Sequence, residues 1–454
     1  MAACSQSVTD SKKEVEESAV QSELVAQTPP MGWNSYNSWG AAVTEKEVRA
    51  NAEYMAKHMK DKGWEYIVVD YCWSYPHPPG SIQSNPPQFR LKKDNAPVPW
   101  LAMDEYGRLL PDSRKFPSSV GGKGFKPLAD YIHSLGLKFG IHVMRGIPRQ
   151  AVWADSPIKG TDVTAGQIAD TTSTCPWLNQ MYGVDMTKMG AQAYHNSLID
   201  LYSEWGVDFI KVDDIDLKEG YPYRKDEAEA FREAIDQGDR PMVLSLSLNM
   251  KYMNRDHVQK QGDMWRISKD FWDEWRLLRD QFDLTAKWSS MSGPNSWPDA
   301  DMLQLGRISR RGPKEEERDS RFTKDEQITH MSLWSIARSP LMMGGDMPMN
   351  SDFVLALLTN EEVIKVNQKG NNPKEVYNDG QLVIWKSEAA DGGINLACFN
   401  ISDEDQKYKI DLVGLGLVGE YSVRDLWKRQ DSGTVSSQLV VQLNQHGSAL
   451  YLLQ

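Results

Sequence analysis

The sequence predicts an α/β protein, a (β/α)8 barrel followed by a small antiparallel β domain. From Pro29 onward, short apolar runs alternate with segments of helical periodicity eight times, over roughly 330 residues, which is typical of such a barrel. After about residue 370 the sequence pattern changes to short apolar runs separated by Gly, Asp and Asn, and in several of them apolar and polar residues alternate with a period of two. The 454 residues suffice for both units. We expect a disordered tether at 1–28, the barrel at 29–368 and the β domain at 369–454.

Eight apolar runs are the expected barrel strands. They are continuous rather than alternating, as in parallel strands that are buried on both faces. The seventh is the weakest. The expected strands are 31–36, 64–73, 137–144, 207–214, 241–248, 263–268, 297–303 and 340–345.

Segments of helical periodicity separate these strands. Thr44 followed three residues later by Glu47 is a capping-box pattern, so a helix should begin there. Gly206 fits the C-cap of another helix. The expected helices are 44–62, 125–135, 188–205, 224–237, 271–282, 325–338 and 355–366.

Two long insertions, 74–117 and 145–186, follow the second and third strands. Because loops after barrel strands lie on the active-site face, these insertions should shape access to any site. Their tryptophans Trp100, Trp153 and Trp177 could form a subsite for a leaving group or simply anchor the loops.

Composition excludes several classes of partner. Hydrophobic residues make up 40% of the chain and charged residues 25%, as in an ordinary globular protein. The net charge of −12 argues against nucleic acid, which needs a basic surface. No apolar run is long enough to predict a membrane span. The 16 tryptophans suit sugar rings, although tryptophan is also a large core residue.

Four cysteines, at 4, 72, 175 and 398, have no CxxC spacing and predict neither a disulfide framework nor a zinc site. Cys72 and Cys398 lie in apolar runs and should be buried thiols. The start MAAC, followed by a polar stretch, resembles the end of a bacterial lipoprotein signal. We therefore expect a secreted or periplasmic protein, with a lipid on Cys4; the alternative is an accidental cysteine in a floppy terminus.

Polar residues gather where the expected strands end. One Asp after a strand is commonly a helix N-cap, and Asp214, Asp216 or Asp273 could be one. The same feature on five strands instead favours a site, because the carboxyl ends of barrel strands meet on one face. The strand-end residues are Trp33, Tyr36, Asp70, His142, Arg145, Lys211, Asp213, Asp214, Arg266, Asp270, Asp299 and Asp301.

Asp213 and Asp270 form the most informative pair, because two carboxylates at strand ends are what cleavage of a glycosidic bond needs. Lys211 lies two residues before Asp213, on the same face of the strand, and would lower the pKa of Asp213, as suits a nucleophile. An acid/base needs a raised pKa. Apolar neighbours could desolvate Asp270, whereas Arg266 would oppose this, and the sequence leaves the balance open. Those neighbours are Trp265, Phe271 and Trp272.

Residues 29 to about 370 resemble glycoside hydrolase family 27, the α-galactosidase group. The matching motifs are PPMGWNSY, YIVVDYCW, GLKFGIH, WGVDFIKVDD, WRISKDFWDEW, WPDADML and LWSIARSPLMMGGD. The resemblance implies a β-sandwich after the barrel, and an exo-acting, retaining hydrolase that removes terminal α-D-galactosyl units from an oligosaccharide or polysaccharide. It implies double displacement with no metal or organic cofactor, and carboxyl groups about 5–5.5 Å apart.

The same resemblance assigns roles to individual residues. It implies that Asp213 is the nucleophile and Asp270 the acid/base. Sugar-binding residues would hold the ring hydroxyls, with Lys211 and Asp70 on the side of the axial O4, and Arg266 and Asp301 on the O2 side. The substrate-binding set is Trp33, Tyr36, Asp70, Tyr71, His142, Lys211, Arg266 and Asp301.

The chain departs from the family at two positions. Family members usually carry two adjacent Asp residues before Cys-Trp, where this chain has Asp70-Tyr71. The second Asp normally faces the C6 hydroxymethyl of galactose, so Tyr71 would fill that pocket unless it points elsewhere. A β-L-arabinopyranosidase, or a 3,6-anhydro-α-D-galactosidase on plant or algal polysaccharide, is therefore an alternative. His142 replaces the usual Tyr and would contact O6 or the leaving group, or be a hydrogen-bonded pocket histidine.

Two other classes are weaker. A non-catalytic carbohydrate-binding protein would not need both Asp213 and Asp270. A barrel enzyme of unrelated chemistry would need a phosphate-binding glycine loop or a metal cluster, and the sequence has neither motif.

Overall fold

A computed structural model describes residues 25–75, 88–90, 97–99, 101–217, 220–247, 249–312, 314 and 316–454. Cys4, most of the expected tether and Trp100 lie outside these residues. The last residues of that expected tether are described and contact the barrel. The backbone N–H of Ala26 donates to Asn295 Oδ1 at 2.8 Å, and the Trp297 indole donates to the Ala26 carbonyl at 2.8 Å.

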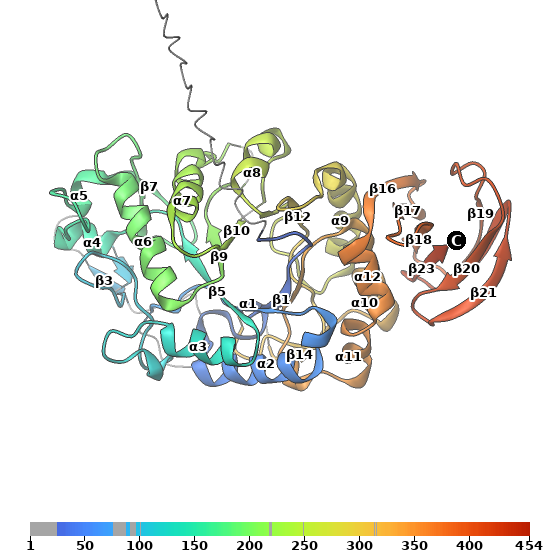
Figure 1. The fold of residues 1–454 in the computed structure, drawn as a ribbon, viewed down its shortest axis with the longest axis horizontal. Helices are drawn as coiled ribbons and strands as arrows, with labels where there is room; N and C mark the ends of the chain where they lie inside the picture. Colours follow the sequence, from blue (N-terminus) through green and yellow to red (C-terminus); the bar gives the residue numbers. More distant parts are fainter. Residues whose placement is uncertain are drawn as a thin grey trace, which may run out of the picture.

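Eight parallel strands form the barrel, which confirms the predicted fold class (Figure 1). A parallel bridge between Leu303, just after the first strand of the sheet order, and Met343, in the last, joins the two ends of the sheet and so closes the ring. Every strand is shorter than the apolar run that predicted it. In sheet order the strands are β12 (Trp297–Asp299), β11 (Met264–Arg266), β10 (Val243–Leu246), β9 (Phe209–Asp213), β5 (Lys138–Met144), β2 (Tyr66–Val69), β1 (Met31–Asn34) and β15 (Leu341–Met343).

Helices surround the strands (Figure 1). The predicted capping box is confirmed, because the Glu47 carboxylate accepts the Thr44 backbone N–H at 2.8 Å. The predicted C-cap is also confirmed, with Gly206 at φ 81° in the left-handed region that favours glycine. The outer helices are α2 (Glu45–His58), α3 (Lys126–Ser134), α6 (Ala191–Trp205), α7 (Lys225–Gln237), α8 (Arg255–Gln261), α9 (Trp275–Trp288), α10 (Lys324–Ala337), α11 (Asp352–Leu358) and α12 (Glu361–Lys369).

Two helix predictions were wrong. The helix expected at 271–282 begins at Trp275 instead, because Asp273 bonds Arg318 at 2.6 Å and holds the preceding residues in a loop. The helix expected at 355–366 is two helices. Asn360 breaks it, since its side-chain oxygen accepts the N–H groups of Glu362 and Val363 and caps α12.

The insertions contain structure of their own. The first carries a hairpin of β3 (Gln88–Arg90) and β4 (Pro97–Pro99). The second folds into a three-stranded sheet with two short helices. These elements are β6 (Ile147–Pro148), α4 (Arg149–Ala154), α5 (Ala165–Ile168), β7 (Ala169–Thr174) and β8 (Met181–Val184).

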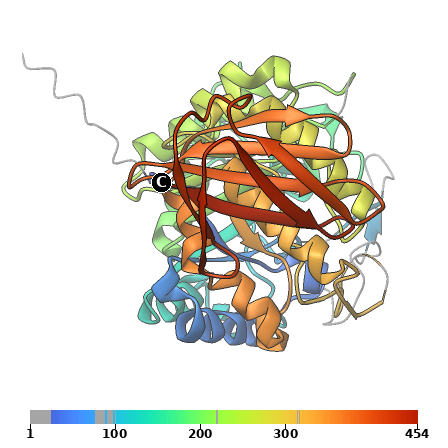
Figure 2. The same cartoon turned by 90° about the vertical axis from the view of Figure 1, so that its right-hand side faces the viewer.

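The C-terminal domain is antiparallel and has a separate apolar core, as the sequence predicts. Six strands form one sheet and two form a second (Figure 2). The larger sheet runs β16 (Asn371–Asn378), β17 (Leu382–Glu388), β18 (Ile394–Asn400), β23 (Ser448–Leu453), β20 (Tyr421–Asp425) and β21 (Gln430–Val435); the smaller pairs β19 (Gln406–Asp411) with β22 (Gln438–Leu443).

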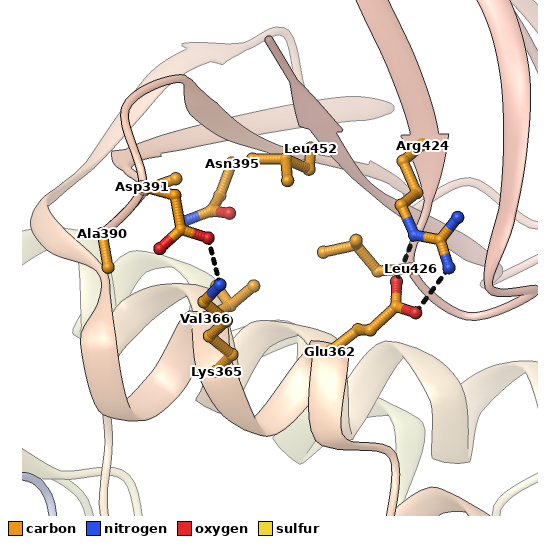
Figure 3. Close-up of a pocket in the computed structure, with 10 residues that line it drawn as sticks. Glu362, Lys365, Val366, Ala390, Asp391, Asn395, Arg424, Leu426 and Leu452 are labelled. Atoms are coloured by element: carbon orange, nitrogen blue, oxygen red, sulfur yellow. Dashed lines mark hydrogen bonds and ion pairs between the residues drawn. The ribbon is translucent and has the colours of Figure 1, made fainter.

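Charged pairs join this domain to the barrel. Figure 3 shows α12 facing the domain across a cavity. The volume of this cavity is about 170 Å³. Glu362 binds Arg424 through two bonds of 2.7 and 2.8 Å, and Lys365 pairs with Asp391. We call this hollow the interdomain cavity. Its charges pair with one another across the junction.

The described cysteines, Cys72, Cys175 and Cys398, are buried and free, which confirms the prediction for Cys72 and Cys398. No helix within the described ranges is long and apolar enough to cross a membrane.

Candidate active site

A cavity of about 240 Å³ lies at the carboxyl ends of the barrel strands. We call it the barrel cavity. It brings together eight of the residues that the sequence predicts for the site. They are Tyr36, Asp70, Tyr71, Lys211, Asp213, Arg266, Asp270 and Asp301. These residues come from positions far apart in the chain, so the barrel topology is what gathers them.

Asp213 is the last residue of β9, and donors hold both its carboxylate oxygens. Its Oδ1 accepts the backbone N–H of Asp214 at 2.6 Å, and its Oδ2 lies 3.1 Å from His142 Nε2. Burial opposes ionisation of Asp213, but the His142 hydrogen bond and the nearby Lys211 ammonium outweigh it, so the pKa of Asp213 lies below its usual value. Asp213 is therefore ionised and oriented at neutral pH, as a nucleophile must be.

Asp70 follows β2 directly and lies beside Lys211. Its Oδ2 accepts from Lys211 Nζ at 3.1 Å and from Asn34 Nδ2 at 2.8 Å. Burial of Asp70 opposes its charge, but the Lys211 ammonium holds the pKa of Asp70 well below its usual range. The result is a buried, charged acceptor beside a cation, an arrangement that can bind sugar hydroxyls in fixed orientation.

Arg266, the last residue of β11, organises the opposite wall. Its Nη2 lies 2.8 Å from Asp301 Oδ2 and 3.5 Å from Asp270 Oδ1. Asp301 also accepts the backbone N–H of Phe271 at 2.7 Å, which fixes the loop that carries Asp270. Burial and the neighbouring carboxylates Asp270 and Asp299 raise the pKa of Asp301, while Arg266 counteracts them.

Asp270 itself lies at the mouth of the cavity. Its side chain is 55% exposed. The sequence left open whether Trp265, Phe271 and Trp272 would desolvate Asp270. They do not, because these three side chains are themselves buried and leave the carboxyl in contact with solvent. An exposed carboxyl at the mouth can reach both a departing group and an incoming water.

Tyr71 lines the cavity and is the centre of an aromatic wall. Its ring makes edge contacts with Tyr36, at 5.5 Å between ring centroids, and with His142, at 5.7 Å. Tyr71 therefore points into the cavity, the first of the two orientations that the sequence left open. The wall is aromatic at the position where members of the resembled family usually carry a carboxylate.

Two predicted substrate-binding residues do not line the cavity. Trp33 is fully buried and its indole N–H donates to the Gly345 carbonyl at 2.8 Å, so it ties β1 to the segment after β15. His142 lies behind the surface and acts on Asp213 instead. Trp33 was predicted from its place near a strand end, but its side chain packs in the barrel interior.

Sequence reasoning missed several residues of the site. Asn34, which bonds Asp70, was not predicted, although it stands in the PPMGWNSY motif, which could have indicated it. Trp177, which the sequence named as either a subsite residue or a loop anchor, lines the cavity from the second insertion and is 42% exposed. The remaining cavity residues are Asn37, Ser247, Phe271, Trp272 and Met302.

Sequence comparison with family models gives two matches. Residues 186–369 match a model described as alpha galactosidase A, and residues 379–453 match one described as the alpha galactosidase C-terminal beta sandwich domain. A solved family 27 β-L-arabinopyranosidase from Geobacillus stearothermophilus is 50% identical, with a TM-score of 0.90, over 95% of this chain and 97% of that one.

The chain belongs to glycoside hydrolase family 27. A putative α-N-acetylgalactosaminidase from Bacillus halodurans has a similar structure, with 43% identity and a TM-score of 0.83 over 95% of this chain and 98% of that one. An α-galactosidase from Cyamopsis tetragonoloba is more distant, at 27% identity over 439 residues, which are 94% of this chain and 87% of the relative. The resemblance found in the motifs is thus confirmed, and this family 27 member is a glycoside hydrolase.

Proposed function

We propose that this family 27 member is a retaining, exo-acting β-L-arabinopyranosidase. The observation that carries the proposal is the position of Tyr71 in the cavity wall, packed between Tyr36 and His142. The family resemblance places residue 71 opposite C6 of a galactosyl unit. L-Arabinopyranose has the ring hydroxyls of galactose but no C6, so it fits beside a tyrosine that would crowd a hydroxymethyl group.

The sequence had favoured α-D-galactosides, with β-L-arabinopyranosides as an alternative. Two facts now favour the alternative. The tyrosine ring faces the cavity, and the 50% identical relative from Geobacillus stearothermophilus is a β-L-arabinopyranosidase. α-Galactosidases such as the Cyamopsis enzyme are only 27% identical.

Two charged pairs bind the sugar. Asp70 and Lys211 bind the hydroxyls at O3 and at the axial O4, because a buried carboxylate beside an ammonium offers both an acceptor and a donor. Arg266 with Asp301 takes the O2 side.

Catalysis proceeds by double displacement. Asp213 attacks the anomeric carbon as Asp270 gives its proton to the departing oxygen, which forms a glycosyl ester on Asp213 and releases the alcohol. Asp270 then takes a proton from water, which attacks the anomeric carbon and frees Asp213. The depressed pKa of Asp213 keeps it ionised for the first step, and the exposure of Asp270 admits water for the second.

The roles of the two carboxylates predict a separation of about 5–5.5 Å between them in the sugar complex, too short for an inverting water. Retention is checked by following the anomer released from an aryl glycoside by proton NMR. Release of the inverted anomer would rule out the double-displacement mechanism.

One substrate panel tests the specificity. We expect 4-nitrophenyl β-L-arabinopyranoside to be cleaved with a kcat/KM at least about tenfold above that for the α-D-galactoside, because the tyrosine crowds one hydroxymethyl group, roughly 1.4 kcal/mol or more. Tyr71→Ala, which opens the wall, should bring the two values together. A preference for the galactoside in wild type, or a ratio unchanged by Tyr71→Ala, contradicts the proposal. The α-N-acetylgalactosaminide and a 3,6-anhydro-α-D-galactoside complete the panel, and preference for either also contradicts it.

A further inference from the structure

The hydrogen bonding of Asp213 differs from that of the other buried carboxylates in the barrel cavity. Asp70 and Asp301 are each in contact with a cation, Lys211 and Arg266, at 3.1 and 2.8 Å. Asp213 instead meets a histidine, whose Nε2 lies 3.1 Å from Oδ2. Within the described part of the chain, His142 is the side chain that is hydrogen-bonded to Asp213.

The chemistry of this contact fixes which nitrogen of His142 carries a hydrogen. An ionised carboxylate only accepts, so Nε2 must be protonated to donate to Asp213. The other nitrogen, Nδ1, is buried and has no hydrogen-bond partner among the residues that the structure describes. Within these residues the orientation of the ring therefore depends on Asp213 and on packing.

Tyr71 supplies that packing. Its ring lies edge-on to the imidazole, with 5.7 Å between centroids and 69° between planes. On its other side Tyr71 is held by Tyr36, again edge-on at 5.5 Å. Rotation of the imidazole away from Asp213 would have to displace a ring that is itself braced.

We propose that His142 is a positioning residue for the nucleophile and that Tyr71 holds it in place, so that the residue facing C6 also maintains the hydrogen bond on Asp213. The proposal rests on the proposed function in taking Asp213 as the nucleophile and in placing residue 71 opposite C6. The positioning role of His142 needs only the first of these and holds for whichever glycoside the enzyme prefers. It implies that glycone specificity and nucleophile activation cannot be changed independently at residue 71.

The hydrogen bond acts on both chemical steps. In the first step it holds the Asp213 carboxylate in the orientation for attack, and this gain outweighs the lower basicity that the bond causes. In the second step it makes Asp213 a better leaving group. It also keeps Asp213 ionised in acid. Without the His142 donor, Asp213 would protonate at higher pH, because burial alone raises its pKa.

Other charged and titratable groups near Asp213 also influence its pKa. The substitutions of His142 leave these cations and acids unchanged. They are Lys211, Arg266, Tyr36, Cys175 and Asp214, and Asp70 lines the same cavity.

The test uses His142→Phe, which keeps a ring against Tyr71 but removes the donor, and His142→Gln, which restores an uncharged donor. We expect His142→Phe to lower kcat/KM about 10- to 100-fold, the cost of one hydrogen bond to a charged group. Its acid limb should move to higher pH, and His142→Gln should move both values back toward wild type. His58→Gln, on α2 and away from the cavity, is the matched control. Wild-type kcat/KM with an unmoved acid limb in folded His142→Phe overturns the proposal.

A double-mutant cycle tests the role of Tyr71. Tyr71→Leu should shift the acid limb in the same direction as His142→Phe, and the double variant should lose little more than His142→Phe alone. Losses that simply multiply would show that Tyr71 does not act through His142.

If His142→Phe does not fold, an NMR measurement on the wild-type enzyme still tests the proposal. ¹⁵N-labelled imidazole shifts, assigned with His142→Gln, should show a hydrogen on Nε2 at neutral pH, and a bare Nε2 overturns the proposal. Failure of the proposed function is separate. It would appear as turnover by Asp213→Asn, whereas failure of this inference leaves Asp213→Asn inactive and His142→Phe normal.

Discussion

The barrel cavity and the interdomain cavity are both lined by acidic and basic side chains, yet these are arranged in opposite ways. In the interdomain cavity each charge pairs across the junction, Glu362 with Arg424 and Lys365 with Asp391. In the barrel cavity the carboxylates Asp70 and Asp213 are held by donors from the protein and still line the hollow. Charges around a hollow thus indicate chemistry only where they are oriented by the protein and left facing the space.

The first prediction makes the same substitution in both cavities. Asp213→Asn should lower kcat by at least about 10⁴-fold, because the nucleophile is lost. Asp391→Asn removes a carboxylate that is half-exposed and paired with Lys365, and should leave kcat unchanged. Steady-state assays on an aryl glycoside measure both. Comparable losses in the two variants would abolish the distinction between the cavities.

The second prediction concerns Asp270, whose carboxyl is at the mouth. Asp270→Ala should cost about 10²- to 10⁴-fold on alkyl glycosides, which need protonation of the leaving oxygen. The loss in the first step should be far smaller for a dinitrophenyl glycoside, and azide should restore turnover with formation of a glycosyl azide. Asp403→Ala, an exposed aspartate of the β domain, is the control. Equal losses on good and poor leaving groups would remove the acid/base assignment.

The third prediction tests whether the substrate-binding part of the barrel cavity extends to Trp177. Trp177 lines it and is 42% exposed, whereas Trp153 is similarly exposed, at 44%, but is not among the lining residues. If Trp177 stacks on the leaving sugar, Trp177→Ala should raise KM for a disaccharide several-fold, about 1 kcal/mol. KM for a glycosyl fluoride should stay within a factor of two. Trp153→Ala is the matched control, and equal effects of the two changes would indicate that both tryptophans only support loops.

The smallest effect is expected at the interdomain cavity. Glu362→Gln weakens an ion pair whose side chains are 27% and 35% exposed, so it should reduce the free energy of unfolding by no more than about 1 kcal/mol. Denaturant unfolding with kcat measured in parallel tests this. A large fall in kcat without loss of stability would connect this junction to the barrel cavity.

Much of this arrangement could be predicted from the sequence. Each barrel strand corresponds to a continuous apolar run in the sequence, and the residues at the carboxyl ends of the strands all lie on one face of the barrel. That rule placed Asp70, Lys211, Asp213 and Arg266 correctly, because position along a strand determines position in a barrel.

The rest depended on contacts between distant segments. Trp33 obeys the same rule yet turns into the barrel interior, where Gly345 accepts its indole N–H. Trp177 reaches the cavity through an insertion whose sheet the sequence did not predict. The exposure of Asp270 follows from the loop that Asp273 and Arg318 hold in place, a contact across 45 residues. No local pattern encodes such pairings.

The identity of the nucleophile is the point on which the remaining assignments depend, and trapping it is the most direct test. A fluorinated arabinopyranosyl fluoride that forms the glycosyl ester quickly and releases it slowly should inactivate the enzyme. Peptide mass spectrometry should then find the sugar on Asp213 of the segment after Phe209. An adduct on Asp270 or Asp70, or inactivation of Asp213→Asn by the same reagent, would contradict the account.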